Sequence, residues 1–326
     1  MTENHAGLSP ASVETIAGLT AGSIATLVVH PLDIVKTRMQ IHQRSAASSH
    51  QPPLTTVSLI RALSQTPNPV ASLYRGLTPN LLGNASSWAS FFFFKARVER
   101  ALLSLKSSSA PDDGSPASLT PRDYFVASGA AGVCTQALTN PIWVVKTRML
   151  SSDRGAAGAY PSMWAGAAHL LRNEGWRGFY RGLGISLVGV AHGAVQFAVY
   201  DPVKRLYLAR RRRRLLSRLP EKEVEPSAQQ ERMSNEATIV ISSVAKLVAG
   251  ATTYPYQVIR SRLQNYDADA RFGRGIRGVA RRTWSEEGWR GFYRGIIPGV
   301  VRVLPATWVT FLVYENMKFY LPQWTS

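Results

Sequence analysis

The side chains best able to do chemistry in this 326-residue chain are charged ones that recur in a fixed pattern. Three times a proline is followed five and seven residues later by bases, in the strings Pro31-Leu-Asp-Ile-Val-Lys36-Thr-Arg38, Pro141-Ile-Trp-Val-Val-Lys146-Thr-Arg148 and Pro255-Tyr-Gln-Val-Ile-Arg260-Ser-Arg262. An acid and a base three residues apart lie on one face of a helix. Around a three-fold axis, the acid of one copy can therefore pair with the base of the next. This chemistry is reversible ion pairing, which can close and open a gate.

A second mark shows that the three strings belong to a repeat. The prolines are 110 and 114 residues apart, and an aromatic-Arg-Gly triplet follows each of them some 40 residues later, at Tyr74-Arg75-Gly76, Tyr180-Arg181-Gly182 and Tyr293-Arg294-Gly295. Two marks that recur in the same order over nearly the whole length define a repeat unit. The sequence therefore predicts one body built from three similar parts that share a core.

Charged residues are absent from four long blocks, which indicates helices that cross a membrane. Residues 15–32, 76–94, 124–145 and 183–200 contain no Lys, Arg, Asp or Glu, and each block approaches the ~20 residues that a helix needs to span a bilayer. Two further blocks are each interrupted by one base, Lys246 within 237–259 and Arg302 within 295–314. These blocks predict six spans, two in each repeat. A soluble helical repeat with unusually few charges is the alternative.

The composition argues against several functional classes. A net charge of +18 is compatible with nucleic-acid binding, but the bases cluster at the ends of the predicted spans and in connections such as Arg210–Arg214, where lipid headgroups attract them. We therefore expect no nucleic-acid partner. The single cysteine, Cys134, excludes an intramolecular disulfide and a cysteine-based zinc site. No metal-ligand spacing, nucleophile elbow or glycine-rich phosphate loop stands out, so we expect neither an enzyme nor a prosthetic group or metal.

The repeat resembles that of the mitochondrial carrier family, whose unit is Pro-x-acid-x-x-base, a loop helix, and then acidic-Gly and aromatic-base-Gly motifs. The resemblance assigns repeats to residues 9–106, 119–212 and 236–326, with a polar linker at 213–235. It implies an all-α membrane protein: six tilted transmembrane helices in three pseudo-symmetric repeats around a central cavity, with short helices on the matrix side. Such a protein, which we expect to be a monomer, exchanges small anionic metabolites across the inner mitochondrial membrane by alternately closing two gates.

Three short strings resemble the branch of this family that transports FAD and folate. They are Pro-Ile-Trp in the second repeat, Tyr-Pro-Tyr-Gln-Val-Ile-Arg in the third, and His192-Gly-Ala-Val-Gln-Phe197. The carriers of NAD and of pyrimidine nucleotides are neighbouring branches. The resemblance thus implies the transport of FAD or folate, with NAD or a pyrimidine nucleotide as the alternative.

The matrix gate, as the family builds it, is depleted of acids in this chain. Its acid, base and bracing positions in the three repeats correspond to Asp33, Lys36 and Gln40, to Trp143, Lys146 and Leu150, and to Gln257, Arg260 and Gln264. Only the first repeat has an acid, all three have a base, and two of the three have the bracing glutamine. The gate therefore has one complete ionic pair to form.

The family's order of pairing predicts the partners in this gate. Asp33 is expected to pair with Lys146, and Gln257 to hydrogen-bond Lys36. Trp143 leaves Arg260 without an ionic partner. The tryptophan is either a selectivity element or a wedge that fills the volume of the missing acid.

The cytoplasmic gate of the family follows the pattern aromatic-acid-x-x-base near the ends of the even-numbered spans. Two repeats match it, with the acids and bases Asp201, Lys204, Glu315 and Lys318. The first repeat aligns Lys95, Ala96 and Glu99 there, so its acid is lost. One bridge, Asp201 to Lys318, is expected. With about one bridge in each gate, we expect a modest barrier between the two states.

Substrate contacts in the family lie seven residues beyond each aromatic-Arg-Gly triplet, which gives Gly83, Gly189 and Arg302. Gly189-Val190 resembles the glycine-aliphatic pair that nucleotide carriers present to an adenine ring. Arg302 is expected to hold phosphate, because a guanidinium can clamp phosphate oxygens with two hydrogen bonds. A structural pairing of Arg302 with a buried carboxylate is the alternative.

Three other residues are candidates for the same site. Trp88, with Asn84 nearby, is placed to stack on a flavin or pterin ring, although an ordinary interface tryptophan is as good an interpretation. Lys246 falls where the other repeats have Gly22 and Gly132. Contact with the substrate and snorkelling at a helix seam are both open for it.

The aromatic-Arg-Gly triplets begin the even-numbered spans, where free backbone amides and the helix dipole attract anions. The ligand that the family implies there is the membrane lipid cardiolipin, and a purely structural turn is the alternative. A scaffold that keeps the carrier fold without transport also stays open, because the gates are eroded and Asn68-Pro69 replaces the Glu-Gly of the other repeats.

Overall fold

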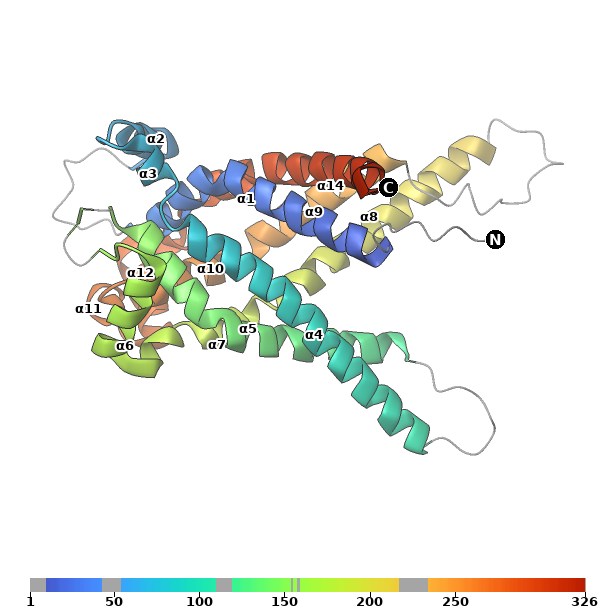
Figure 1. The fold of residues 1–326 in the computed structure, drawn as a ribbon, viewed down its shortest axis with the longest axis horizontal. Helices are drawn as coiled ribbons and strands as arrows, with labels where there is room; N and C mark the ends of the chain where they lie inside the picture. Colours follow the sequence, from blue (N-terminus) through green and yellow to red (C-terminus); the bar gives the residue numbers. More distant parts are fainter. Residues whose placement is uncertain are drawn as a thin grey trace.

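The computed structural model describes residues 10–42, 54–109, 119–153, 155–156, 159–216 and 234–325. Every regular element among these residues is an α-helix (Figure 1). Six long helical segments form the body: α1 (Pro10–Ile41), α4 (Leu77–Ser109), α5 (Pro121–Ser151), α7 (Leu183–Val188) with α8 (Ala191–Leu216), α9 (Asn235–Thr252) with α10 (Tyr254–Gln264), and α13 (Ile296–Val301) with α14 (Val303–Thr325). The predicted all-α architecture is confirmed.

Shorter helices gather at one end of this body, which we call the capped end (Figure 1, left). They are α2 (Thr56–Ser64), α3 (Pro69–Leu73), α6 (Met163–Phe179), α11 (Ala268–Phe272) and α12 (Gly275–Gly291). Helix α1 begins and α14 ends toward the opposite end, which we call the far end. The short helices lie in the segments between the two long elements of each repeat, as the sequence predicts.

Several of the long segments have the length and composition of membrane spans. Three qualify by themselves, Val13–Ile41, Leu183–Arg214 and Ile296–Leu321, and the bent pair Ala237–Thr252 and Tyr254–Gln264 makes a fourth. Helices α4 and α5 are long enough, at 33 and 31 residues, but contain more polar residues. Polar side chains are tolerated in a membrane when they face the interior of a helix bundle. Six long segments are therefore present, and four of them, counting the bent pair as one, are apolar enough to cross a membrane.

Large apolar side chains on the outside of the long helices fit a lipid environment. Phe92, Phe93, Phe125, Leu312 and Phe319 are all exposed. A water-soluble protein rarely exposes so many large apolar groups together. In a bilayer these same side chains contact hydrocarbon, so their exposure carries no penalty.

The long helices close into a ring through contacts between neighbouring repeats. Helix α4 packs against α5, α8 packs against α9, and α14 packs back against α1. Each even-numbered span thus lies beside the odd-numbered span of the following repeat. The third repeat contacts the first, which produces the pseudo-three-fold arrangement.

Each odd-numbered span contains one of the repeated prolines, at a place where a helix can bend. Pro31 lies inside α1 and Pro141 inside α5. Pro255 follows the break between α9 and α10, which are bent by 57°. A proline removes a backbone donor and kinks the helix. Helices α1, α5 and α10 contact one another toward the capped end.

The residue before each proline ties the bend to the aromatic-Arg-Gly triplet of the same repeat. His30 lies 2.9 Å from the Arg75 oxygen, Asn140 donates to the oxygens of Phe179 at 2.7 Å and Arg181 at 3.4 Å, and Tyr254 donates to the Arg294 oxygen at 3.0 Å. An imidazole, an amide and a phenol thus each form a hydrogen bond with a main-chain oxygen at the aromatic-Arg-Gly triplet. Polar side chains that bond irregular backbone make such bends tolerable within a membrane.

A ring of arginines closes the capped end. The arginines seven residues after the prolines, Arg38, Arg148 and Arg262, donate from Nε to the main-chain oxygens of Leu150, Gln264 and Gln40, at 3.1, 3.1 and 3.0 Å. Each oxygen belongs to the residue nine positions after the proline of the next repeat. We call these three hydrogen bonds the arginine ring. It joins the first repeat to the second, the second to the third, and the third to the first.

Candidate functional site

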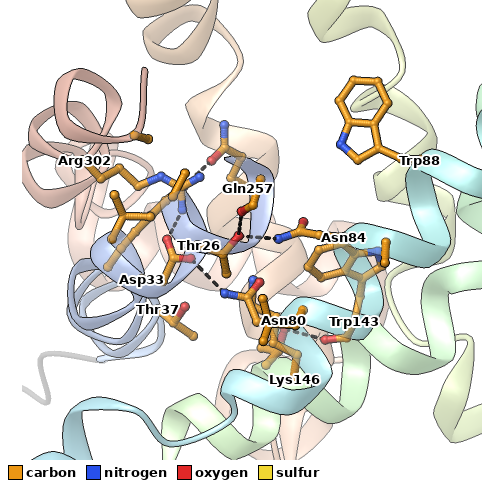
Figure 2. A pocket seen from close by; sticks show the side chains of 18 of the residues that line it. Thr26, Asp33, Thr37, Asn80, Asn84, Trp88, Trp143, Lys146, Gln257 and Arg302 are labelled. Atoms are coloured by element: carbon orange, nitrogen blue, oxygen red, sulfur yellow. Dashed lines mark hydrogen bonds and ion pairs between the residues drawn. The ribbon is translucent and has the colours of Figure 1, made fainter. Parts of the chain in front are cut away.

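A central cavity of about 520 Å³ lies among the long helices (Figure 2). Residues of α1, α4, α5, α10 and α14 supply most of its walls, and His192 of α8 adds one side chain. The sequence predicts these helices to be nearly free of charge between their ends. The charged residues that do line the cavity therefore dominate its electrostatics.

The cavity wall is strongly positive. Four cations line it, Lys36, Lys146, Arg260 and Arg302, against one carboxylate, Asp33, which gives a net charge of +3. The three bases of the predicted matrix gate are thus brought together with the base of the predicted substrate site. Charge inside a membrane protein is expensive enough to need a functional reason. An anion in this cavity would provide one.

Arg302 and Asp33 form an ion pair, which corrects the prediction for Asp33. The guanidinium contacts the carboxylate, and Asn80 of α4 donates to the other carboxylate oxygen at 3.3 Å (Figure 2). The expected pairing of Asp33 with Lys146 is wrong in this conformation. The reason is the packing of α14 against α1, which places Arg302, at the junction of α13 and α14, next to the carboxylate. Arg302 therefore has the carboxylate partner that the sequence left as its alternative role.

The rest of the gate at the capped end follows the sequence more closely. Lys36 donates to Gln257 at 2.8 Å, as predicted. Gln40 lies between Tyr254, to whose hydroxyl it donates at 3.2 Å, and Ser261, which donates to it at 2.7 Å.

Gln264, the second predicted brace, also joins two repeats. It accepts from Thr147 at 3.0 Å and lies 3.5 Å from the oxygens of Asn140 and Arg181. The side chain of Gln40 contacts two hydroxyl groups, and that of Gln264 contacts a hydroxyl and two amide oxygens. Neither of these side chains has a hydrogen bond to a charged side chain among the described residues.

Trp143 stands where the family has an acid, and its indole ring lies beside two cations. The Lys146 ammonium lies 4.6 Å from the indole ring, and the Arg260 guanidinium lies 6.0 Å from it. A cation near the face of an aromatic ring is stabilised by about 0.5–2 kcal/mol. One guanidinium nitrogen of Arg260 is buried with no hydrogen-bond partner among the described residues. The tryptophan thus accommodates two cations without neutralising either of them.

The predicted substrate residues divide into two groups. Asn84 and Trp88 line the cavity, and Asn84 donates to Thr26 at 3.2 Å, whereas Trp88 is largely exposed at its edge (Figure 2). Gly83, Gly189 and Val190 do not line it.

Neighbouring side chains fill the space beside those three residues. A Cβ added to Gly83 would lie 3.4 Å from Trp143, and one added to Gly189 would lie 2.9 Å from the Tyr256 hydroxyl. Val190 packs against Gly132 of α5, whose added Cβ would lie 2.9 Å from it. The predicted flat slot for an adenine ring is therefore occupied by tyrosine in this conformation.

Lys246 lines a smaller neighbouring cavity of about 150 Å³ and not the central one. The sequence left open whether Lys246 contacts the substrate or snorkels at a helix seam, and its position decides this only in part. The Lys246 residue is exposed, and its cavity shares the lining residues Lys36, His192, Gln257 and Arg302 with the central one.

The gate predicted for the far end is not assembled. Asp201 and Glu315 are exposed, and neither forms an ion pair with a described residue. Lys318 pairs with Glu14 of α1 at 3.1 Å, so the expected bridge to Asp201 is wrong in this conformation. Lys204 lies 6.0 Å from the Tyr200 ring. The capped end is thus joined across all three repeats, whereas the one predicted pair of the far end is apart.

The arginines of the aromatic-Arg-Gly triplets all contact protein. Arg75 donates to the Met149 and Tyr160 oxygens at 2.7 and 3.1 Å, Arg181 pairs with Glu174 at 2.7 Å, and Arg294 pairs with Glu287 at 2.8 Å. The following glycines have φ angles of 72°, 72° and 80°, a left-handed conformation that favours glycine. These contacts favour the structural turn, and cardiolipin binding stays a prediction.

Thr26, Asn80 and Tyr256 are among the polar residues of the cavity that were not singled out from the sequence. Asn80 and Asn84 are four residues apart in a block without charges. Such a pair on one helical face in a membrane span is a signal of an inward-facing polar stripe. That spacing was available in the sequence.

Comparisons with known proteins all find carriers and transporters. A family model described as mitochondrial carrier protein matches residues 9–106, 117–211 and 231–323. The chain is similar to the mitochondrial FAD carrier protein FLX1 of Saccharomyces cerevisiae, with 37% identity over 95% of this chain and 97% of the relative. It is 31% identical to the chloroplastic folate transporter 1 of Arabidopsis thaliana, over 94% of each chain. It is also 31% identical to the mitochondrial nicotinamide adenine dinucleotide transporter 2 of the same plant, over 94% of this chain and 79% of the relative.

Proposed function

Because this chain belongs to the mitochondrial carrier family, we propose that it transports a large anionic cofactor, FAD or folate, across the inner mitochondrial membrane. The observation that carries the proposal is the central cavity of about 520 Å³, whose wall has four cations and one carboxylate. Cavities that hold small molecules measure about 300–1,000 Å³. The positive charge selects anions, and the volume suits a molecule larger than a simple metabolite.

FAD is the cargo that the named relatives and the cavity together favour. A relative that is 37% identical is named an FAD carrier. The pyrophosphate of FAD supplies negative charge for Arg302 and the neighbouring bases, and guanidinium groups bind phosphate oxygens well. Trp88 at the edge of the cavity offers a flat surface on which an isoalloxazine or pterin ring can stack. Asn84 offers a carbonyl oxygen and an amide to the edge of such a ring.

Alternating access is the mechanism that the two ends favour. In the conformation described, the arginine ring and the contacts of Lys36 with Gln257 and of Trp143 with Arg260 hold the capped end together, while the predicted partners at the far end are apart. We assign this conformation to a carrier closed toward the matrix. Binding of cargo would release the capped end and allow the far end to close. No covalent step is required.

We also propose that the transporting unit is a monomer that binds cardiolipin near the aromatic-Arg-Gly turns. The cavity and its gates lie within one chain, so no second copy is needed to complete the site. The turns end at left-handed glycines that begin α7 and α13, and backbone amides at helix starts attract anions.

Uptake into liposomes tests the proposed function. The purified protein is reconstituted, and the entry of labelled FAD, folate, NAD and UTP is measured in parallel. Saturable uptake of FAD or folate that Arg302→Ala abolishes is expected. Arg205→Ala, which removes an exposed arginine of α8 outside the cavity, is the matched control and should leave uptake unchanged.

The other outcomes separate the alternatives. Uptake of NAD or UTP in place of FAD would keep the transport mechanism and overturn the cargo. No uptake of any of them, together with no thermal stabilisation by any of them, would favour a scaffold that keeps the carrier fold. A ligand that binds the folded state must raise its stability.

A further inference from the structure

A second cavity of about 150 Å³ lies beside the central one, among α8, α9, α10, α13 and α14. We call it the side cavity. Lys36, His192, Gln257 and Arg302 line both cavities, so the two spaces meet at these side chains. Lys246 lines only the side cavity. A cargo group held by Arg302 therefore has a neighbouring space that opens toward Lys246.

Lys246 is an unusual residue for its position. It is the one charged residue between positions 237 and 259. No hydrogen bond or ion pair joins it to a residue that the structure describes. Charge within a span is costly and is retained where it has a function. An ammonium without a protein partner that faces a cavity is a ready ligand for an anion.

The equivalent positions of the other repeats show that Lys246 is specific to the third. They are Gly22 and Gly132, nine residues before the respective prolines. In the second repeat Val190 leaves no room for a side chain, since a Cβ on Gly132 would lie 2.9 Å from it. In the third repeat the side cavity lies at this position, and a long basic side chain lines it.

His192, which also lines the side cavity, is not the anion ligand. Its Nδ1 lies 2.8 Å from the Thr253 hydroxyl, and that hydroxyl donates its own hydrogen to the Ala249 oxygen at 2.7 Å. Nδ1 must therefore be the donor in this contact, and Nε2 of the neutral ring has no hydrogen to offer. Among the residues that line the side cavity and not the central one, Lys246 is the cation that an anion can bind.

We propose that the side cavity is a second phosphate subsite: Lys246 binds one phosphoryl group of a pyrophosphate whose other phosphoryl group contacts Arg302. A cavity of about 150 Å³ has room for a phosphate-sized group but not for a ring system, because whole ligands need about 300 Å³ or more. The ammonium is a compact point charge, which suits a single phosphate. The subsite makes the carrier selective for dinucleotides joined by a pyrophosphate over compounds with one phosphate or with carboxylates. The inference rests on the proposed transport of a cofactor.

Paired ligands test the subsite. The thermal stability of the purified protein is measured over a series of concentrations of two pairs of ligands. FMN lacks the second phosphate and the adenosine of FAD, whereas AMP differs from ADP by one phosphate alone. Lys246→Gln is expected to weaken the binding of FAD and ADP about tenfold and to change that of FMN and AMP less than twofold. Lys246→Arg, which keeps the charge, should retain most of the preference. Lys106→Gln removes a positive charge from the far end of α4 and should change none of the four affinities.

Each result has one meaning for the proposal. Equal weakening of the one-phosphate and two-phosphate ligands in Lys246→Gln, or no weakening of either, overturns the subsite. Stabilisation of the unmodified protein by ADP but not by FAD overturns FAD as the cargo, and the subsite then stands or falls on the ADP and AMP pair. No stabilisation by either FAD or ADP overturns the subsite and FAD as the cargo, and the uptake of labelled folate then decides whether the proposed transport stands.

Discussion

Replacing Asp33 by asparagine should lower the stability of the empty protein and raise its affinity for an anionic cargo. Asparagine has nearly the same shape, and its oxygen can still accept from Asn80. The change removes the charge that faces Arg302. The two effects have opposite signs because Asp33 occupies the guanidinium that the cargo needs. An anion that reaches Arg302 must first displace the carboxylate.

The burial of the pair sets the size of both effects. The Asp33 side chain is 8% exposed and that of Arg302 is 35% exposed. Breaking a fully buried ion pair costs about 3–5 kcal/mol. Water can partly solvate the freed guanidinium, so we expect a loss of about 1.5–3 kcal/mol, the range for hydrogen bonds to charged groups. The same free energy opposes cargo binding in the native protein, so its removal should raise affinity by roughly ten- to a hundredfold at most.

Thermal denaturation of the purified protein, with and without a concentration series of FAD, measures both effects in one experiment. The variant should unfold at a lower temperature without ligand and reach half of its maximal stabilisation at a lower FAD concentration. Asp123→Asn is the matched control, because it breaks the Lys106–Asp123 pair far from the cavity. It should lower stability and leave FAD affinity unchanged. If Asp33→Asn weakened FAD binding, or left it unchanged while stability fell, the account of Asp33 as a competitor for Arg302 would be refuted.

Two further predictions concern the capped end. Trp143→Leu should lower the stability of the empty protein by about 1–2 kcal/mol, because two cations lose the aromatic ring beside them. Thermal denaturation should show a smaller loss of stability for Trp308→Leu, which changes an exposed tryptophan. Equal losses in the two variants would contradict the role given to the Trp143 ring. Burial alone would raise the pKa of the Glu174 carboxyl in α6, but hydrogen bonds and charges from Arg148 and a second arginine outweigh it and lower the pKa below 4.5. Glu174 therefore stabilises the protein above about pH 4.5, and this contribution is lost as the pH falls through the lowered pKa. The difference in unfolding temperature between the native protein and Glu174→Gln should shrink between pH 6 and pH 3, and a constant difference would contradict the assignment.

The sequence predicted those contacts that follow from counting along the repeats. The hydrogen bond between Lys36 and Gln257 followed from the spacing of the prolines together with the order of pairing that the family resemblance implies. The bend between α9 and α10 and the convergence of the bases followed from the repeated prolines and bases. The short helices were implied by the family resemblance. These features depend on backbone register, which the repeated motifs fix.

The spacing of the repeated motifs could not predict contacts that depend on how far a side chain extends from one helix to another. Arg302 and Asp33 are 269 positions apart in the chain, and their pairing requires the packing of α14 on α1. The hydroxyl of Tyr256 fills the space beside Gly189, which register alone does not reveal. The pairing of Asp201 with Lys318 depends on which of two conformations the protein adopts, and one sequence encodes both.

The arginine ring also sets the order in which the molecule can be assembled. Its bonds between the first and second repeats and between the second and third can form as soon as each new repeat is made. The last bond, from Arg262 to the oxygen of Gln40, joins residues 222 positions apart. Closing such a long segment carries an entropic cost, which the contacts between neighbouring repeats reduce by shortening the free chain. The capped end of a nascent chain therefore stays open on one side until the third repeat is complete, and a chain that stops after two repeats leaves the acceptor of the first without its donor.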